Sequence, residues 1–312
     1  MNGKTAVLLL AYGGPDSLED IEPYLLDVRG GRPTAPELVA EVRERYARIG
    51  GRSPLLEITR AQAQRLEARL AAVHAGRPTR VYVGMRHWTP YIAETVRQIA
   101  ADGFERVVAL CMAPHASRYS TSAYRKKLDA AVEELGRPLE VIFIESWHDQ
   151  PGFIQAIAEN IRSALERFPA DARASVHHLF SAHSLPAAIL EQGDPYPAQL
   201  AETARLVAER LGLPPAQWSQ CYQSAGAIPG KWLGPQVDEI LPELAERGVS
   251  DVLITAIGFV ADHVEVLYDL DVEAREQAEA LGLRFQRTAS PNTSPAFIDA
   301  LAQVVEDKLR DR

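Results

Sequence analysis

Short, continuous runs of apolar residues alternate with amphipathic stretches along the chain, and this alternation constrains the fold more than any other feature. A strand that is apolar on both faces must be covered on both faces, which is typical of a parallel sheet between helices. Runs such as AVLLLA, VVALCM and VLITAI are of this kind. Eight strands are expected, at Thr5–Ala11, Arg80–Met85, Arg106–Met112, Glu140–Glu145, Val176–Ser181, Trp218–Tyr222, Asp251–Ile257 and Leu283–Gln286.

Stretches with helical spacing separate these strands. The clearest are Thr59–Ala75, Pro151–Phe168, Pro235–Arg247 and Ser294–Leu309. Alternating strands and helices predict βαβ units and a doubly wound α/β fold, with four strands in each of two similar domains. We expect domains over residues 1–150 and 151–312, and the last helix could pack back on the first domain. The segment 16–60 is too long for a simple crossover and is read as a functional insertion.

Composition excludes several classes of function. A net charge of −9 over 312 residues argues against nucleic acids and anionic membranes as partners. No apolar run approaches the roughly 20 residues that span a bilayer. The only two cysteines, Cys111 and Cys221, rule out a disulfide scaffold and are expected to be buried core residues in a cytoplasmic protein.

A glycine-rich turn, Ala11–Pro15, follows the first strand and could bind a phosphate. Neither the G-x-G-x-x-G fingerprint nor the P-loop pattern is present, which disfavours a nucleotide-dependent oxidoreductase.

A histidine, His183, lies in the stretch SAHSLP directly after a predicted strand. Ligands bind at the carboxyl ends of strands in open α/β sheets, and imidazole is the commonest metal ligand. A histidine that only hydrogen-bonds the following turn is the alternative reading.

An acidic stretch follows the strand at Asp251–Ile257. If it is helical, five carboxylates spaced by three and four residues form one stripe; they are Asp262, Glu265, Asp269, Glu273 and Glu276. Either this stripe is a solvated face or it conducts a divalent cation, which would offset the repulsion between like charges. Arg275 is its only basic residue, which is poor compensation for a solvated face.

The insertion has the opposite charge. Residues 29–60 carry seven arginines and four glutamates, a net charge of +3. Arginine binds carboxylates bidentately, so a planar polycarboxylate is a natural ligand. Ion pairs along a solvated helix, such as Glu41–Arg45 and Glu44–Arg48, are the alternative. The stretch SRYSTSAYRKK at 117–127 also suits an anion, or else caps a helix.

Together these features resemble the ferrochelatases, which insert ferrous iron into a porphyrin in haem synthesis. The matching motifs run in order over nearly the whole chain: AYGGP at 11–15, YARIGGRSPL at 46–55, APH at 113–115, ESW at 145–147, SAHSLP at 181–186, GDPYP at 193–197, WLGP at 232–235 and GFVADHVEVLYD at 258–269. The resemblance implies two Rossmann-like domains, the class II chelatase fold.

The resemblance also implies site residues. His183 and Glu265 would bind iron and accept pyrrole protons, and Asp269 and Glu273 would lead metal toward them. Residues on the opposite wall would contact the porphyrin; they are Tyr12, Arg29, Arg45, Tyr46, Ser53 and Tyr124. No chemistry is assigned to His87 or His115.

The charged insertion favours coproporphyrin III, with four propionates, over protoporphyrin IX, with two. The product would then be coproheme. Two cysteines cannot hold the iron–sulfur cluster found in some relatives, so iron is expected only as a substrate, with no resident cofactor. A monomer without stable membrane insertion, in transient contact with neighbouring haem-pathway enzymes at most, fits this reading. A protoporphyrin IX enzyme and a non-catalytic haem or metal carrier remain alternatives.

Overall fold

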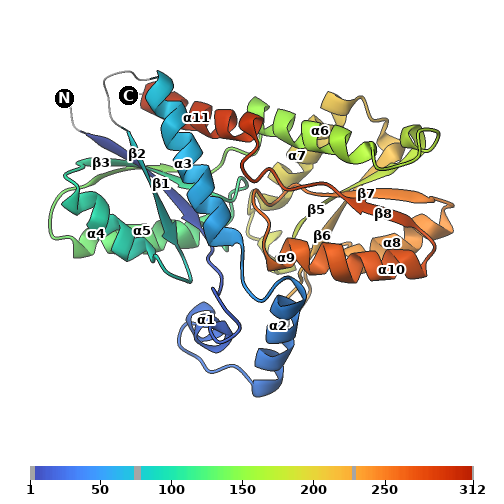
Figure 1. The fold of residues 1–312 in the computed structure, drawn as a ribbon, viewed down its shortest axis with the longest axis horizontal. Coiled ribbons are helices and arrows are strands. Elements are labelled where there is room, and N and C mark those ends of the chain that lie inside the picture. The colour runs from blue at the N-terminus through green and yellow to red at the C-terminus, as the bar shows by residue number, and fades with distance from the viewer. Residues whose placement is uncertain (1–3, 74–78, 227–229, 311–312) are drawn as a thin grey trace. The chain divides into compact units, whose positions relative to one another are not determined.

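The computed structural model describes residues 4–73, 79–226 and 230–310, and its two parallel sheets are visible in Figure 1. The first sheet contains β1 (Thr5–Ala11), β2 (Arg80–Met85), β3 (Arg106–Cys111) and β4 (Glu140–Ile144), in the order β2-β1-β3-β4. The second contains β5 (His177–His183), β6 (Trp218–Gln223), β7 (Asp251–Ala256) and β8 (Arg284–Arg287), in the order β6-β5-β7-β8. The identical order of strands confirms two similar α/β halves.

The helices connect and cover these strands. In the first half they are α1 (Ile21–Val28), α2 (Pro36–Arg48), α3 (Leu55–Val73), α4 (Ile92–Ala101) and α5 (Thr121–Glu134). In the second half they are α6 (Pro151–Leu165), α7 (Tyr196–Leu211), α8 (Val237–Glu246), α9 (Val264–Leu267), a π-helix (Asp269–Ala274) and α10 (Arg275–Ala280), followed by α11 (Pro295–Arg310). Short 3₁₀ helices lie at Arg173–Ser175, Ala187–Ile189 and Pro215–Gln217. None of the helices in the described residues is long and apolar enough to span a bilayer.

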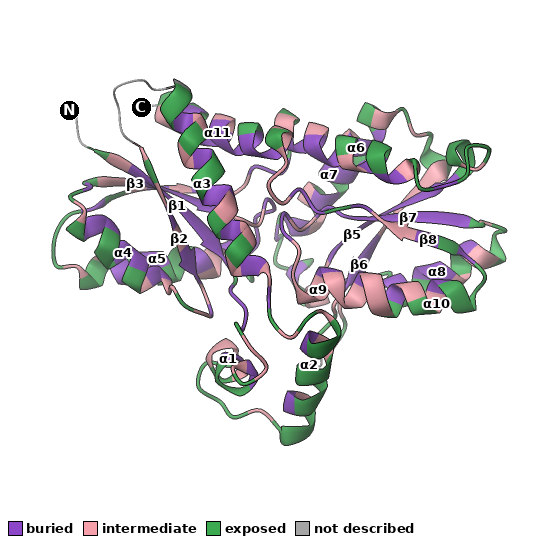
Figure 2. Cartoon of the chain, in the orientation of Figure 1, coloured by how far each residue is buried: buried purple, intermediate pink, exposed green. Residues whose placement is uncertain are grey.

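The first sheet is buried on both faces, as its apolar runs predict (Figure 2). Alternate residues of β1, including Leu8 and Leu10, pack with Val96 of α4 and Leu128 of α5. The helix α3 packs on β1 and β2 and against α11. The alternation of side chains along a strand therefore supplies a separate core on each face of the sheet.

The second sheet is covered in the same way. Leu179, Val252 and Ile254 pack with residues of α8 and of the stretch from α9 to α10. The helices α6 and α7 pack against each other and contact β7 and β6 respectively.

The chain divides into two compact units. The first contains residues 1–114, 118–147 and 292–312, and the second contains 115–117 and 148–291. The helix α11 therefore belongs with the first sheet, although it follows the last strand of the second.

The strand positions expected from the sequence are confirmed to within two residues at each end. The helices differ more. The helix expected at Thr59–Ala75 begins at Leu55, and residues 74 and 75 of that range lie outside the described residues. The helix expected at Pro151–Phe168 ends at Leu165. The predicted insertion holds two helices of its own, α1 and α2, before α3 begins.

Candidate functional site

A close approach between two backbone segments forms the site in the second unit. His183 is the last residue of β5, and the chain leaving β7 passes beside it at Gly258. A Cβ atom added to Gly258 would lie 2.8 Å from the Cβ of Ala182, closer than such atoms come in proteins. Only glycine therefore allows this crossing, which delivers the GFVADHVEVLYD segment to the end of β5.

The carboxylate of Glu265 lies between two imidazoles. Its Oε1 is 3.4 Å from Nε2 of His183, and its Oε2 is 3.4 Å from Nε2 of His263. The sequence interpretation assigned no role to His263, which belongs to the same motif as Glu265. The signal was available: His263 precedes Glu265 by two residues and the helix begins only at Val264, so both side chains can turn to the same point.

The other nitrogen of each ring fixes its orientation. Nδ1 of His183 donates to the carbonyl of Ser184, and Nδ1 of His263 donates to the carbonyl of Ala261 over 3.1 Å. A carbonyl oxygen can only accept, so each Nδ1 carries a hydrogen and each Nε2 is directed at Glu265. A hydrogen bond at Nδ1 fixes the tautomer and the orientation of the ring, which prepares Nε2 to bind a metal.

Electrostatics makes His183 and Glu265 an ion pair. Burial lowers the pKa of His183, but the Glu265 carboxylate and the hydrogen bonds of the ring outweigh it and raise this pKa to about 9. Burial raises the pKa of Glu265, but the neighbouring His183 and His263 hold it well below its usual range. At neutral pH a proton on Nε2 of His183 therefore occupies the place between the two groups.

Side chains of β5, β6 and α7 hydrogen-bond the backbone that carries the ion pair, either directly or through one another. The side chain of Gln223, at the end of β6, donates to the carbonyl of Glu265 over 2.5 Å. Ser181 donates in turn to the amide oxygen of Gln223 over 2.8 Å. The buried hydroxyl of Tyr196 donates to the carbonyl of His183 over 2.9 Å. These bonds fix the backbone on both sides of the ion pair.

The two carboxylates predicted to lead metal to the site, Asp269 and Glu273, lie in the π-helix that follows α9. The hydroxyl of Ser224 donates to Asp269, which is half-buried. Glu273 is exposed and lies in the π-helix, where its amide donates to the carbonyl of Tyr268 over 3.0 Å. Single π-helical turns within α-helices occur frequently at functional sites.

The single helical stripe expected from the sequence is wrong in this structure. Asp262 precedes α9, and the helix changes type at Asp269. Asp262 is paired with Arg287 of β8, at 3.2 Å between Oδ1 and Nη1. The compensating cation thus comes from a strand about 25 residues away, which spacing within the segment could not reveal.

Within the described residues, no group of three or more His, Cys, Asp or Glu side chains is arranged to hold a metal ion. His183 and Glu265 alone offer one nitrogen and one oxygen.

The turn after β1 is shaped by its two glycines. Gly13 has a φ of +96°, and a Cβ on Gly14 would lie 2.5 Å from the hydroxyl oxygen of Ser53. Ser53 and Tyr46 are buried, and the Tyr46 hydroxyl is also within 3.6 Å of that position. Both residues therefore pack against the turn that carries Tyr12.

An aromatic and cationic cluster surrounds Tyr12 in the first unit. The Tyr12 side chain is 38% exposed, and its ring centroid lies 4.7 Å from that of His87. The guanidinium of Arg86 lies 5.7 Å from the centre of the Tyr12 ring and 5.5 Å from that of Tyr124. Nδ1 of His87 is 2.7 Å from a carboxylate oxygen of Asp27. Sequence reasoning did not single out Arg86, which links two of the predicted porphyrin residues.

The two arginines of the insertion that were predicted to contact the porphyrin, Arg29 and Arg45, have different surroundings. Arg29 follows α1 directly and is exposed. Arg45 pairs with Glu41 over 2.8 Å, which is the helical ion pair of the alternative interpretation. Ion pairs of this exposed kind contribute little stability, so they do not prevent an arginine from turning to a ligand.

Three further histidines, His115, His177 and His178, are buried. Nε2 of His115 hydrogen-bonds the hydroxyl of Thr203 over 2.9 Å, and burial lowers the pKa of His115 to about 3. His177 and His178 are buried in β5, and burial lowers the pKa of both to about 4. The burial of His177 and His178 favours a structural role for both.

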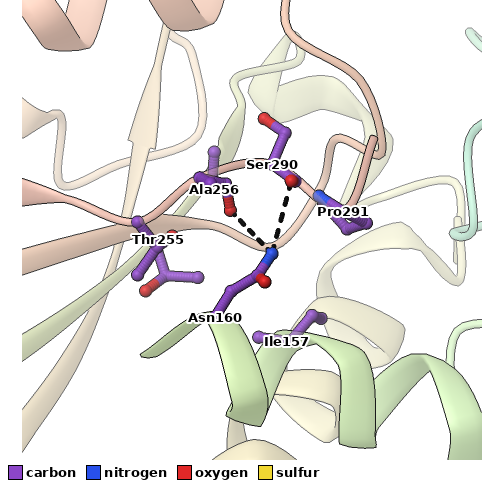
Figure 3. Close-up of a pocket in the computed structure, with 8 residues that line it drawn as sticks. Ile157, Asn160, Thr255, Ala256, Ser290 and Pro291 are labelled. Atoms are coloured by element: carbon purple, nitrogen blue, oxygen red, sulfur yellow. Dashed lines mark hydrogen bonds between the residues drawn. The ribbon is translucent and has the colours of Figure 1, made fainter. Parts of the chain in front are cut away.

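A small pocket is lined by residues of α6, of the end of β7 and of the chain that follows β8 (Figure 3). Its lining includes Asn160, Thr255 and Ser290, but neither His183 nor Glu265. The side chains of His183 and Glu265 are each about one-third exposed, at 31% and 33%. We therefore place the candidate site at these two side chains and not in this pocket.

Solved structures share the fold. SirB from Bacillus subtilis with Fe3+ matches with a TM-score of 0.61 and 11% identity, over 98% of this chain and 95% of that chain. CbiX, the terminal enzyme for biosynthesis of siroheme in denitrifying bacteria, matches with a TM-score of 0.56 and 12% identity, over 97% and 98%. At such identities the likeness concerns the fold, which is that of the class II chelatases.

Sequence comparison identifies the family. The ferrochelatase family model matches residues 4–309. A relative from Deinococcus radiodurans named ferrochelatase is 47% identical over 97% of this chain and 95% of its own length. A relative from Bacillus subtilis named coproporphyrin III ferrochelatase is 39% identical over 98% of both chains. The chain belongs to the ferrochelatase family, and its substrates are a porphyrin and iron.

Proposed function

We propose that this ferrochelatase inserts ferrous iron into coproporphyrin III, with His183 and Glu265 as the groups that hold the incoming metal. The observation that carries the proposal is the placement of Glu265 between two imidazoles whose Nε2 atoms are each 3.4 Å from its carboxylate. A metal bound between Nε2 of His183 and Oε1 of Glu265 would take the place of the shared proton.

The proton balance follows from this exchange. Ferrous iron displaces the Nε2 proton of His183 to solvent as it binds. When the metal moves to the four porphyrin nitrogens, two pyrrole N–H protons must leave. His183 is then free again, and with a pKa of about 9 it accepts one of these protons at neutral pH. The second leaves to solvent through Glu265, so each cycle releases two protons and restores the ion pair.

Asp269 and Glu273 would supply the metal. They lie one and two turns beyond Glu265, and Glu273 is exposed to solvent. Carboxylates in series raise the local concentration of a divalent cation.

The porphyrin would lie against Tyr12. Its exposed ring and the adjacent Arg86 offer a flat aromatic surface beside a cation. The insertion would bind the propionates through arginines such as Arg29, and its net charge of +3 supports four propionates better than two. Ser53, Tyr46 and Tyr124 are buried, so we assign them mainly to the shape of this wall.

Several relatives bear on the choice of porphyrin. Those from Geobacillus kaustophilus and Bacillus subtilis, at 42% and 39% identity, are named coproporphyrin III ferrochelatase. The relative from Deinococcus radiodurans is named only ferrochelatase. The charged insertion is therefore the feature of this chain that favours coproporphyrin III.

The enzyme is expected to work without a prosthetic group. Both cysteines are buried in strands, and burial raises the pKa of Cys111 to about 12. A four-thiolate cluster would need two more cysteines than the chain contains. We also expect a cytoplasmic monomer, which sedimentation and fractionation can check.

The test compares kcat/KM for iron insertion into coproporphyrin III and protoporphyrin IX under identical conditions. We expect a clear preference for coproporphyrin III. Exchanging Arg29 for Ala should lower kcat/KM for coproporphyrin III more than for protoporphyrin IX. A preference of the unmodified enzyme for protoporphyrin IX would overturn the substrate, and stoichiometric binding without turnover would favour a carrier.

A further inference from the structure

We infer that Arg287 is a positioning residue for the metal-binding pair, because it joins the two ends of the segment that carries His263 and Glu265. This inference rests on the function proposed above for His183 and Glu265. It concerns a residue of β8 that touches neither of them.

Arg287 binds two carboxylates on either side of that segment. Its Nε and Nη2 donate to the two carboxylate oxygens of Asp271 over 2.8 and 2.7 Å. Its Nη1 lies 3.2 Å from Oδ1 of Asp262. Asp262 comes one residue before His263, and Asp271 comes two residues after Asp269. One guanidinium thus closes the stretch 262–271 into a loop.

We call the contacts of Arg287 with Asp262 and Asp271 the bracket. The geometry of the bracket requires an arginine. The bond to Asp271 is bidentate and planar, which an ammonium cannot reproduce. Only 11% of the Arg287 side chain is exposed, so these bonds are shielded from water. Without the cation, Asp262 would lose this ion pair, and Asp271 would keep the more distant Arg275, whose Nη2 lies 3.8 Å from its Oδ1.

Hydrogen bonds from other elements also hold the chain at and after β8, from which Arg287 extends. Ser290 donates to the same oxygen of Asp262 over 2.8 Å. Asn160 of α6 donates to the carbonyls of Ala289 and Ser290 over 3.0 and 3.3 Å, as the dashed bonds in Figure 3 show. The backbone carbonyl of Arg287 accepts from Arg167. Arg287 therefore transmits a fixed position from β8 and α6 to the metal-binding segment.

The stretch 262–271 is not one regular α-helix, so contacts with other elements set its position; these are the core packing of Val266 and Leu270 and the bonds of Arg287. The helix α9 is only four residues long, and the π-helix follows it. Short helices are marginal by themselves. The backbone of Glu265 is otherwise held by the side chain of Gln223.

The experiment measures binding of Co2+ alone, by calorimetry, to the unmodified enzyme and to Arg287→Met, Arg287→Lys and Asp271→Asn. Loss of a direct hydrogen-bond partner of a metal ligand typically weakens binding about 10–100-fold. Arg287 acts through Asp262 and Asp271 and does not touch a ligand, so we expect about 10-fold, the lower end of that range, for Arg287→Met and a smaller loss for Arg287→Lys and for Asp271→Asn. The KM for iron should rise while the KM for the porphyrin stays unchanged, a split that general destabilisation would not produce.

Arg284→Met is the matched control. Arg284 lies on the same strand and pairs with Asp251, away from the bracket. This variant should bind Co2+ like the unmodified enzyme. If Arg287→Met does not fold, Arg287→Lys and Asp271→Asn carry the test.

The outcomes separate the two proposals. Wild-type Co2+ affinity in folded Arg287→Lys and Asp271→Asn variants would overturn the positioning role of Arg287. Failure of His183→Ala to weaken Co2+ binding by the otherwise unmodified enzyme would instead overturn the proposed metal-binding pair.

Discussion

Nε2 of His183 lies 3.4 Å from Oε1 of Glu265, and Nδ1 of the same ring donates to the carbonyl of Ser184. The imidazole is thus held at one nitrogen by the backbone and directed at a carboxylate with the other. A proton or a metal can occupy the space between them, but not both. If His183 binds the metal substrate as proposed, binding is therefore coupled to release of a proton.

Replacing His183 with Ala should lower kcat for iron insertion by at least about 100-fold, the lower end of the usual contribution of a positioned acid or base. The loss combines one missing metal ligand and one missing proton acceptor. A continuous assay of porphyrin absorbance measures it. His148→Gln is the control, because His148 bonds Glu202 on α7 and does not touch Glu265. Near-normal turnover of His183→Ala would refute the role assigned to the pair.

The affinity for a divalent metal should rise with pH up to about 9. Protonated His183 competes with the metal for Nε2, and its pKa is raised to about 9, so each step toward that pH frees more of the ligand. Titrating Co2+ binding between pH 6 and 9 tests this dependence. His183→Gln has no such proton and should show a flatter profile, whereas an unchanged slope would assign the proton to another group.

The same ion pair should stabilise the folded state over a defined range of pH. A raised pKa of His183 stabilises the protein fully below its unfolded value of 6.5, and this stabilisation is lost as pH rises through about 9. The lowered pKa of Glu265 contributes above the unfolded value for glutamate and is lost in acid. The difference in melting temperature between the unmodified enzyme and His183→Gln should therefore be largest between about pH 4.5 and 6.5, where both contributions are complete. Equal differences at pH 7 and pH 10 would count against the ion pair.

The strands could be predicted from the sequence because they are local and uniformly apolar. In β1 every residue from Ala6 to Ala11 is buried, so periodicity alone identifies it. The helix ends were harder, because neighbouring contacts decide them. Leu55 begins α3 early, where its amide donates to the hydroxyl of Ser53 over 3.3 Å.

The meeting of His183 and Glu265 was predictable because each follows a strand, whereas the contact of Arg287 with this segment was not. The sequence interpretation placed His183 at the end of a strand and Glu265 after another, and parallel strands bring such ends together. Arg287 could not be found in this way, since its partners lie 16 and 25 positions earlier. The acidic stretch contains only one basic residue, Arg275, to compensate its carboxylates. This was the one indication in the sequence that a cation from elsewhere in the chain pairs with them.

Replacing His263 with Ala should lower kcat by about 10-fold, less than the loss of His183. His263 holds Oε2 of Glu265, so without it the carboxylate can rotate away from Nε2 of His183. His263→Gln keeps a donor of similar reach and should recover part of the activity. Steady-state kinetics of both variants decides this, and equal activities of His263→Ala and the unmodified enzyme would show that Oε2 needs no partner.

Replacing Gly258 with Ala should destabilise the protein by about 1–3 kcal/mol, the usual range for an inserted methyl group in a packed region. The new Cβ would lie 2.8 Å from Cβ of Ala182 and 3.2 Å from its Cα, so the segment before Glu265 must move. Urea denaturation measures the loss of stability, and Co2+ binding should weaken in the same variant because the carboxylate moves away from His183. Adding Ala182→Gly removes the closer of the two contacts and should restore part of both properties. If the double variant recovers stability but not metal binding, the backbone has settled in a shifted position; if Gly258→Ala alone keeps both, the close crossing of the two segments is not what sets the distance between His183 and Glu265.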